Sequence, residues 1–269
     1  MTRRPLIPLL LAAALVCAAA PARSETLLAQ YAKDKAPGVE GAPSGDALQG
    51  LLPPDAELID VPTAAVLDLG GFYSKTRFFA QGGLLEWLNF GIYPRVNLGA
   101  SFNIDKMVGT GSPVQITRPE LQLKLRFYDG DRVIPAFALG FDGQGYFYNR
   151  TVKRYNHKQR GLYVVGSQEV GVPGLEFHAG MNISDFDSNS LFGIIAASLN
   201  VQDKLKLMVE WDNINDFFDS RFNTGLRIHM TPHFNLGFSV RAIGQGGDFS
   251  NGVPRSTERV VQFKYTGNF

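Results

Sequence analysis

Over most of its length, this chain repeats short segments in which apolar and polar residues alternate. The segment 259–269 shows the pattern clearly. Its apolar side carries Val261, Phe263, Tyr265 and Phe269, and its other side carries polar residues. Successive side chains point to opposite faces of a β-strand, so a period of two predicts strands with one apolar and one polar face. A fold built from such strands has to bury the apolar face of each strand, either against other protein or in lipid.

Twelve alternating segments follow one another, separated by residues that favour turns. Their connections alternate between short turns, such as 172–174, and longer stretches, such as 142–160. Bacterial membrane barrels have an even number of strands, with tight turns at one end and long loops at the other. We therefore expect residues 65–269 to form an all-β, transmembrane, antiparallel up-and-down β-barrel of about 12 strands. The expected strands are 66–79, 84–93, 95–104, 118–128, 133–141, 161–171, 175–183, 191–200, 204–212, 222–230, 234–243 and 259–269.

The composition agrees with this expectation. After the amino-terminal segment, no run of 18 apolar residues remains, which argues against a helical membrane protein. The formal net charge of +1 gives no reason to expect a nucleic-acid partner. A soluble β-sandwich is the alternative fold, because its strands also alternate. The asymmetric connections and the amino-terminal segment favour the barrel.

The amino terminus has the features of a secretory signal peptide. Arg3 and Arg4 precede an apolar run at 6–16, and small residues favour cleavage after Ala22. We expect residues 1–22 to be removed, which leaves 24 basic and 25 acidic residues and a charge of −1. The single cysteine, Cys17, lies within this segment. A lipoprotein signal at Cys17 is the alternative reading.

The next part, residues 23–64, lacks a sustained period and is rich in Pro and Gly. We expect a short, irregular segment in the periplasm, and a plug inside the barrel is the alternative. An even number of strands places both ends of the barrel in the periplasm. Phe269 then closes the last strand and resembles the aromatic signal by which the barrel-assembly machinery recognises its clients. The expected location is the outer membrane of a Gram-negative-type bacterium.

Where the alternation is clean, it assigns side chains to the lipid or to the lumen. Leu121, Leu123, Leu125 and Phe127 should face lipid, because charged side chains on that face cost about 2–4 kcal/mol near the midplane. The facing of the segments 161–171 and 191–200 remains ambiguous. The charged side chains expected in the lumen fit two interpretations, an interior of mutual salt bridges and a charge-selective path. In the second, Arg227, Arg241 and Lys264 could form a basic stripe for an anionic polysaccharide. The candidate lumen residues are Lys124, Arg126, Lys206, Glu210, Arg227, Arg241 and Lys264.

Catalysis and metal binding find little support in the sequence. A phospholipase-type site needs a Ser and a His on neighbouring strands. No nucleophile motif flanks His157 or His233, and we expect His178 and His229 to be hydrogen-bonded residues of the lumen. Acidic loop residues such as Asp185 and Asp216 are oxygen ligands suited to Ca²⁺, but solvated loop acids are the simpler reading. We expect no enzyme activity, no cofactor and no metal.

Three stretches, 59–64, 135–146 and 163–167, resemble the YjbH-like outer-membrane proteins associated with exopolysaccharide production. This resemblance implies a channel or accessory role in polysaccharide export, and a small-solute porin is the main alternative, with an outer-membrane hydrolase third. In 135–140 the residues expected to face inward are small, which would leave room in the lumen or allow a loop to insert there. The glycines that follow permit a sharp turn. Gln168 stands where family members often carry Lys. The motif residues are Pro135, Ala136, Gly140, Asp142, Gly143, Gly145 and Ser167.

Overall fold

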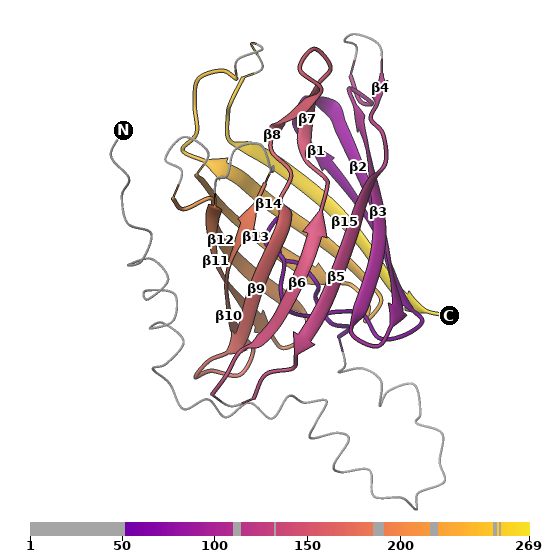
Figure 1. Ribbon diagram of the computed structural model, residues 1–269, viewed down its shortest axis with the longest axis vertical. Helices are drawn as coiled ribbons and strands as arrows, with labels where there is room; N and C mark the ends of the chain where they lie inside the picture. Colours follow the sequence, from indigo (N-terminus) through magenta and orange to yellow (C-terminus); the bar gives the residue numbers. More distant parts are fainter. Residues whose placement is uncertain are drawn as a thin grey trace, which may run out of the picture.

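The computed structural model describes residues 52–109, 114–131, 133–184, 191–215, 220–249, 252 and 254–269. In this part of the chain, consecutive strands pair antiparallel, and the first strand also pairs with the last, so the sheet closes into a barrel (Figure 1). Twelve strands form its wall, as the alternation predicts. They are β1 (Gly71–Phe79), β2 (Gly83–Tyr93), β3 (Val96–Asp105), β5 (Glu120–Tyr128), β6 (Ala136–Asp142), β9 (Gly161–Glu169), β10 (Leu175–Ile183), β11 (Leu191–Val201), β12 (Leu205–Asp212), β13 (Arg221–His229), β14 (Phe234–Ile243) and β15 (Glu258–Asn268).

Four further elements lie at one end of the barrel, which carries the long connections and is called the loop end here. The 3-10 turn η2 (Ala80–Gly82) joins β1 to β2, and the two-residue strand β4 (Gln115–Ile116) extends the sheet beside β3. The strands β7 (Tyr146–Asn149) and β8 (Arg154–His157) form a separate hairpin. The opposite end, called the turn end, carries the short connections and the end of β15 (Figure 1).

The outer surface of the wall is apolar. On β5, the side chains of Leu121, Leu123, Leu125 and Phe127 are 41–54% exposed, while the alternate Gln122 and Lys124 are buried inside. This is the facing expected for a barrel embedded in lipid. Glu86 is an outward carboxylate, and it accepts hydrogen bonds from Ser74 and Thr76 on the neighbouring strand. No helix in the described residues is long and apolar enough to cross a membrane.

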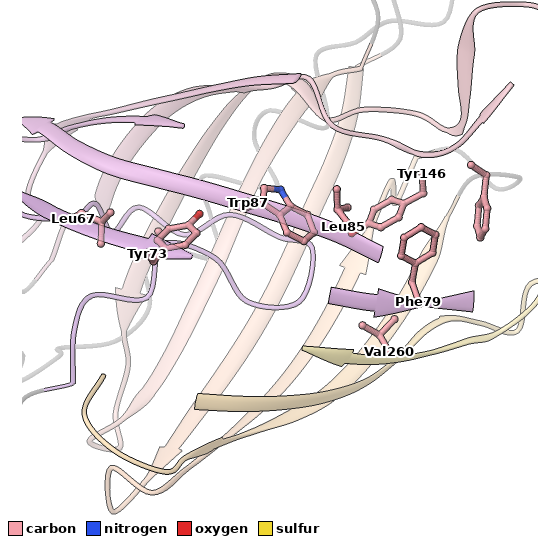
Figure 2. Close-up of a cluster of buried hydrophobic side chains, with 9 residues drawn as sticks. Leu67, Tyr73, Phe79, Leu85, Trp87, Tyr146 and Val260 are labelled. Carbon is pink, nitrogen blue, oxygen red and sulfur yellow. The ribbon is translucent and has the colours of Figure 1, made fainter. Parts of the chain in front are cut away.

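Near the loop end, an aromatic cluster packs inside the lumen. Phe79 contacts the rings of Tyr146 and Phe147 edge to face, with centroids 5.4 and 5.6 Å apart, so the hairpin β7–β8 folds over the end of β1. Leu85 and Val260 complete the contact from β2 and β15 (Figure 2). The hairpin is therefore a packed part of the barrel interior.

Two differences from the expected strands have local causes. β1 begins at Gly71, not at residue 66, because the chain turns just before it: Gly70 has a φ of +80° and Gly71 N donates to Asp68 O over 2.9 Å. β6 begins at Ala136, not at residue 133, because the chain turns at 131–134, where Asp131 Oδ1 accepts the N–H groups of Val133 and Ile134 over 2.7 and 2.8 Å. Phe269 lies at the turn end, 85% exposed, with its ring stacked on Phe72 at 4.9 Å. Its role as an assembly signal stays a prediction.

Candidate functional site

The lumen contains the segment that precedes β1. Of the residues expected to form a periplasmic segment or a plug, the structure describes 52–64, and it places 55–64 inside the barrel. Leu58 and Val61 have no exposed surface, and Ile59 is 3% exposed. We call residues 55–64 the inserted segment. Residues 1–51, which include the expected signal peptide, lie outside the described residues.

Apolar contacts hold one side of the inserted segment. Leu58, Ile59 and Val61 pack against Ile194, Ala196 and Met208 of β11 and β12. Further along, Ala64 packs against Ala138, Tyr163 and Val165 of β6 and β9. Burying such side chains stabilises the inserted position by about 1.5–3 kcal/mol for each large one. These contacts explain why the segments 161–171 and 191–200 are apolar on both faces: one face meets lipid and the other meets the inserted segment.

Glu210 of β12 fixes the turn at the tip of the inserted segment. Its Oε1 accepts the backbone N–H groups of Ile59, Asp60 and Val61 over 2.7, 3.0 and 3.0 Å. Its Oε2 accepts from Asn223 Nδ2 over 3.0 Å. A fully buried carboxylate needs several donors, and here the backbone of the segment supplies most of them. The turn and the wall therefore depend on each other.

Asp55 anchors the segment toward the turn end. Its carboxylate lies 3.2 Å from both Lys206 Nζ and Lys264 Nζ, and Arg227 donates to it as well. Burial would raise the pKa of Asp55, but Arg227, Lys206 and Lys264 hold that pKa well below its ordinary value of 3.8. Asp55 is therefore ionised at neutral pH.

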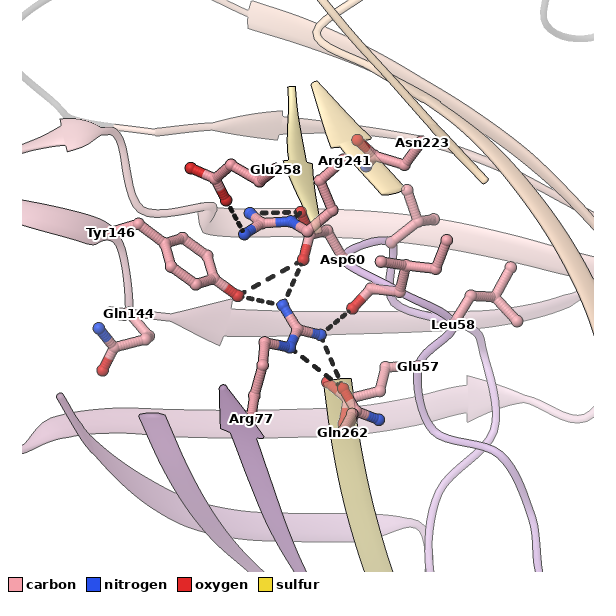
Figure 3. Close-up of polar contacts among 12 residues, drawn as sticks. Glu57, Leu58, Asp60, Arg77, Gln144, Tyr146, Asn223, Arg241, Glu258 and Gln262 are labelled. Carbon is pink, nitrogen blue, oxygen red and sulfur yellow. Dashed lines mark hydrogen bonds and ion pairs between the residues drawn. The ribbon is translucent and has the colours of Figure 1, made fainter. Parts of the chain in front are cut away.

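Asp60 anchors the segment toward the loop end. Arg77 of β1 and Arg241 of β14 each approach its carboxylate to 2.7 Å (Figure 3). Arg77 also donates to the carbonyl of Ile59 and to the hydroxyl of Tyr146, which links the segment to the hairpin β7–β8. Although burial opposes ionisation, Arg241 and Arg77 keep the pKa of Asp60 below its ordinary value.

Two lysines complete the attachment. Lys75 Nζ lies 2.7 Å from Glu57 Oε1 and 3.3 Å from the centroid of the Trp87 ring, so it makes an ion pair and a cation–π contact. Lys124 donates to the backbone carbonyls of Ala56, Thr63 and Ala65. Six of the seven expected lumen residues are thus buried around the segment. Arg126 instead lies at the rim of the turn end, with 27% of its side chain exposed and Asp129 as its ion-pair partner.

Asp55, Glu57 and Asp60 were not among the functional residues expected from the sequence. Their spacing was visible, since three carboxylates fall within six positions just before the first strand. Lys75 and Arg77 were visible too, because they alternate with apolar residues in that strand. The sequence did not indicate that these carboxylates pair with these two cations, because the contacts between them form only when the barrel closes.

Two small cavities lie beside the inserted segment, each with a volume of about 40 Å³. The first reaches the loop end, since Lys158, Ser184 and Asn213 line it, and the second reaches Asn97 near the turn end. Glu57, Asp60, Asp142 and Arg160 line both cavities, so the two adjoin along one side of the segment. Both are walled largely by polar and charged groups, which suits water and hydrophilic solutes.

The residues of the 135–146 motif serve the inserted segment and its surroundings. Ala138 packs on Ala64, and a Cβ added at Gly140 would come within 2.4 Å of the Tyr163 ring. Small residues therefore admit the close approach of the segment here. Asp142 accepts from Gln144 N over 2.9 Å and turns the chain toward the hairpin. Of the remaining motif residues, Pro135 precedes β6, Ala136 packs beside Ala138, and Gly143 and Gly145 flank Gln144.

Ser167 and His178 lie on neighbouring strands, and Ser167 Oγ is 2.8 Å from His178 Nδ1. The same Oγ accepts the N–H of Ala64 over 2.8 Å, so the inserted segment covers the hydroxyl. His178 Nε2 has no hydrogen-bond partner among the described residues, so no carboxylate there orients the ring. The pair consequently serves as a contact for the segment and lacks the third member that a hydrolase triad requires. The described residues contain no group of three or more His, Cys, Asp or Glu placed to hold a metal, and Asp185 and Asp216 lie outside them.

Searches of protein-family models and of curated proteins find no match to this chain. Among solved structures, it is similar to the NanC porin, with a TM-score of 0.41, 10% identity, and 74% of this chain and 99% of that chain covered. It is also similar to the KdgM porin, with a TM-score of 0.44, 11% identity, and 72% and 98% covered. A third is the outer membrane protein Omp33 of Acinetobacter baumannii, with a TM-score of 0.41, 10% identity, and 74% and 97% covered. The barrel fold of this chain is shown by its own strand pairing, in which the first strand meets the last.

Proposed function

We propose that this protein is a non-enzymatic outer-membrane channel whose lumen is constricted by its own inserted segment. The observation that carries the proposal is the pair of adjoining polar cavities beside residues 55–64, which run from the loop end toward the turn end. The apolar outer wall supports a position in lipid, and the hydrophilic lumen supports a path for water and polar solutes.

Planar-bilayer conductance tests the channel. We expect the mature protein to show small conductance steps, because side chains of the wall and of the segment narrow the path. Deletion of residues 23–64 should enlarge the steps, since it empties the lumen. Deletion of 23–51 alone is the matched control, because it retains the inserted segment and should leave the conductance unchanged. Absence of current from all three proteins would show a sealed, structural barrel.

The cargo we propose is an exopolysaccharide. The resemblance of 135–146 to the YjbH-like proteins supports this role. Loss of the protein should reduce the polysaccharide secreted by the cell, and the full-length chain should restore it. Unchanged secretion with a conducting barrel would favour the small-solute porin. Insertion by the barrel-assembly machinery, with Phe269 as its signal, is part of the same proposal.

A further inference from the structure

The wall that holds the inserted segment carries more positive charge than the segment needs. Six basic side chains of the wall form ion pairs with three carboxylates of the segment, those of Asp55, Glu57 and Asp60. Two of the six also pair with carboxylates of the wall, Arg241 with Glu258 over 3.0 Å and Lys206 with Glu176 over 3.8 Å. The six cations come from five strands that are adjacent in the barrel, β1, β15, β14, β13 and β12. We call them the cationic face. Its members are Lys75, Arg77, Lys206, Arg227, Arg241 and Lys264.

Within this face, like charges are direct cross-strand partners. Lys75 on β1 is opposite Lys264 on β15, and Lys206 on β12 is opposite Arg227 on β13. Like charges in such positions destabilise a sheet unless a counter-charge lies between them. Asp55 supplies that charge to Lys206, Arg227 and Lys264, and Glu57 supplies it to Lys75. The wall alone is therefore built for an anion.

We infer that the cationic face is a binding track for a linear polyanion, and that the inserted segment occupies it as an internal mimic of that polymer. This inference rests on the proposed function and names the class of its cargo: a chain of carboxylate-bearing sugars. Two features of the segment support the mimicry. Asp55 and Glu57 are two residues apart, which is about 6–7 Å in extended backbone, so the carboxylates are presented serially along the chain. The carboxylates of the segment contact basic side chains of the wall, and Lys124 binds backbone carbonyls of the segment. The lumen therefore accommodates both charged and neutral oxygens of a bound polymer.

Equilibrium binding to the full mature chain in detergent tests the inference. The probe is a fluorescently labelled polygalacturonate oligomer followed by anisotropy, with a neutral dextran oligomer of similar size beside it. In the variant Asp55→Asn/Glu57→Gln/Asp60→Asn, the mimic loses its charge and the cations remain. We expect this variant to bind polygalacturonate about tenfold tighter than the unmodified chain, because an internal competitor reduces apparent affinity to the fraction of sites that it leaves free. Salt should weaken the binding, and dextran should not bind.

Adding Arg227→Gln and Lys264→Gln to that variant should return the affinity to the starting level. The matched control adds Arg95→Gln and Arg126→Gln, which remove two cations paired with Asp129 at the rim, and should retain the tight binding. Heat-dependent gel mobility reports whether each barrel is folded. If the triple variant does not fold, Asp55→Asn alone should still tighten binding measurably.

The inference is overturned if the folded triple variant, or the folded Asp55→Asn variant, binds polygalacturonate no tighter than the unmodified chain. It is also overturned if the control with Arg95→Gln and Arg126→Gln loses as much binding as the variant with Arg227→Gln and Lys264→Gln. Because binding is measured without a membrane, its outcome is separate from that of the conductance experiment. A sealed barrel that binds polygalacturonate would refute the channel and keep the track. A conducting barrel that does not bind polygalacturonate would support the channel and refute the binding track.

Discussion

Glu210 Oε1 accepts the backbone N–H of Ile59 over 2.7 Å, which ties the middle of strand β12 to the tip of a segment 151 positions away in sequence. Asp60 and Val61 share the same carboxylate. A single wall residue therefore satisfies three consecutive buried donors.

We predict that Glu210→Ala loosens the inserted segment. Each buried donor left without an acceptor costs about 1–3 kcal/mol, so the turn at 58–61 should lose its place in the lumen. The measurement is thiol labelling of a cysteine introduced at Val61, which is fully buried in the unmodified protein. Labelling should become at least several-fold faster.

Glu176→Ala is the control for this change. Glu176 also points from the wall near Lys206, but its side chain is 43% exposed and its distance to Lys206 is 3.8 Å. Its loss should leave the labelling rate unchanged. Equal rates in the two variants would mean that Glu210 does not hold the segment.

We predict that acid releases the inserted segment. The pKa values of Asp55, Glu57 and Asp60 all lie below their ordinary values in the folded protein. The segment's attachment is therefore fully present above about pH 4 and is lost as the pH falls below that value toward the folded pKa values. Conductance recorded from pH 7 to pH 3 should rise in the lower part of this range. In Asp55→Asn the rise should be smaller, and a flat profile in the unmodified protein would contradict the prediction.

We predict that Gly140→Ala destabilises the barrel near the inserted segment. The added Cβ would lie 2.4 Å from the Tyr163 ring and 2.8 Å from the backbone oxygen of Leu123, and the backbone cannot yield easily. Overpacking of this kind costs about 1–3 kcal/mol. The temperature at which the gel mobility changes should fall. Gly193→Ala on β11 is the control, because its Cβ would meet nothing closer than 4.0 Å.

We predict that Leu58→Ala weakens the inserted position without opening the wall. Leu58 is fully buried against Ile194 and Met208, and a buried Leu→Ala change costs about 2–5 kcal/mol. Labelling at a cysteine in place of Val61 should accelerate, while the strand content measured by circular dichroism stays constant. Loss of strand signal would show that the segment is needed to keep the wall intact.

Alternation and turn residues were sufficient to predict the wall. The period of two identified the twelve strands and the outward face of Leu121 to Phe127, because lipid imposes the same requirement on every strand. It left the facing of β9 and β11 open, because Val165 and Ile194 are apolar and their partners inside the barrel cannot be known from the local pattern. It could not connect Asp60 with Arg241 either. That contact joins residues 181 positions apart and follows from closure, which a local pattern does not contain.

The closing seam of the barrel joins β1 to β15, and the inserted segment is bound by residues on both sides of it, Lys75 and Lys264 among them. The full set of counter-charges around Asp55 and Glu57 thus exists only when the first and last strands have met. The two strands that close the wall therefore also supply cations that hold the segment at its centre, so the same pair of strands completes the barrel and fixes the contents of its lumen.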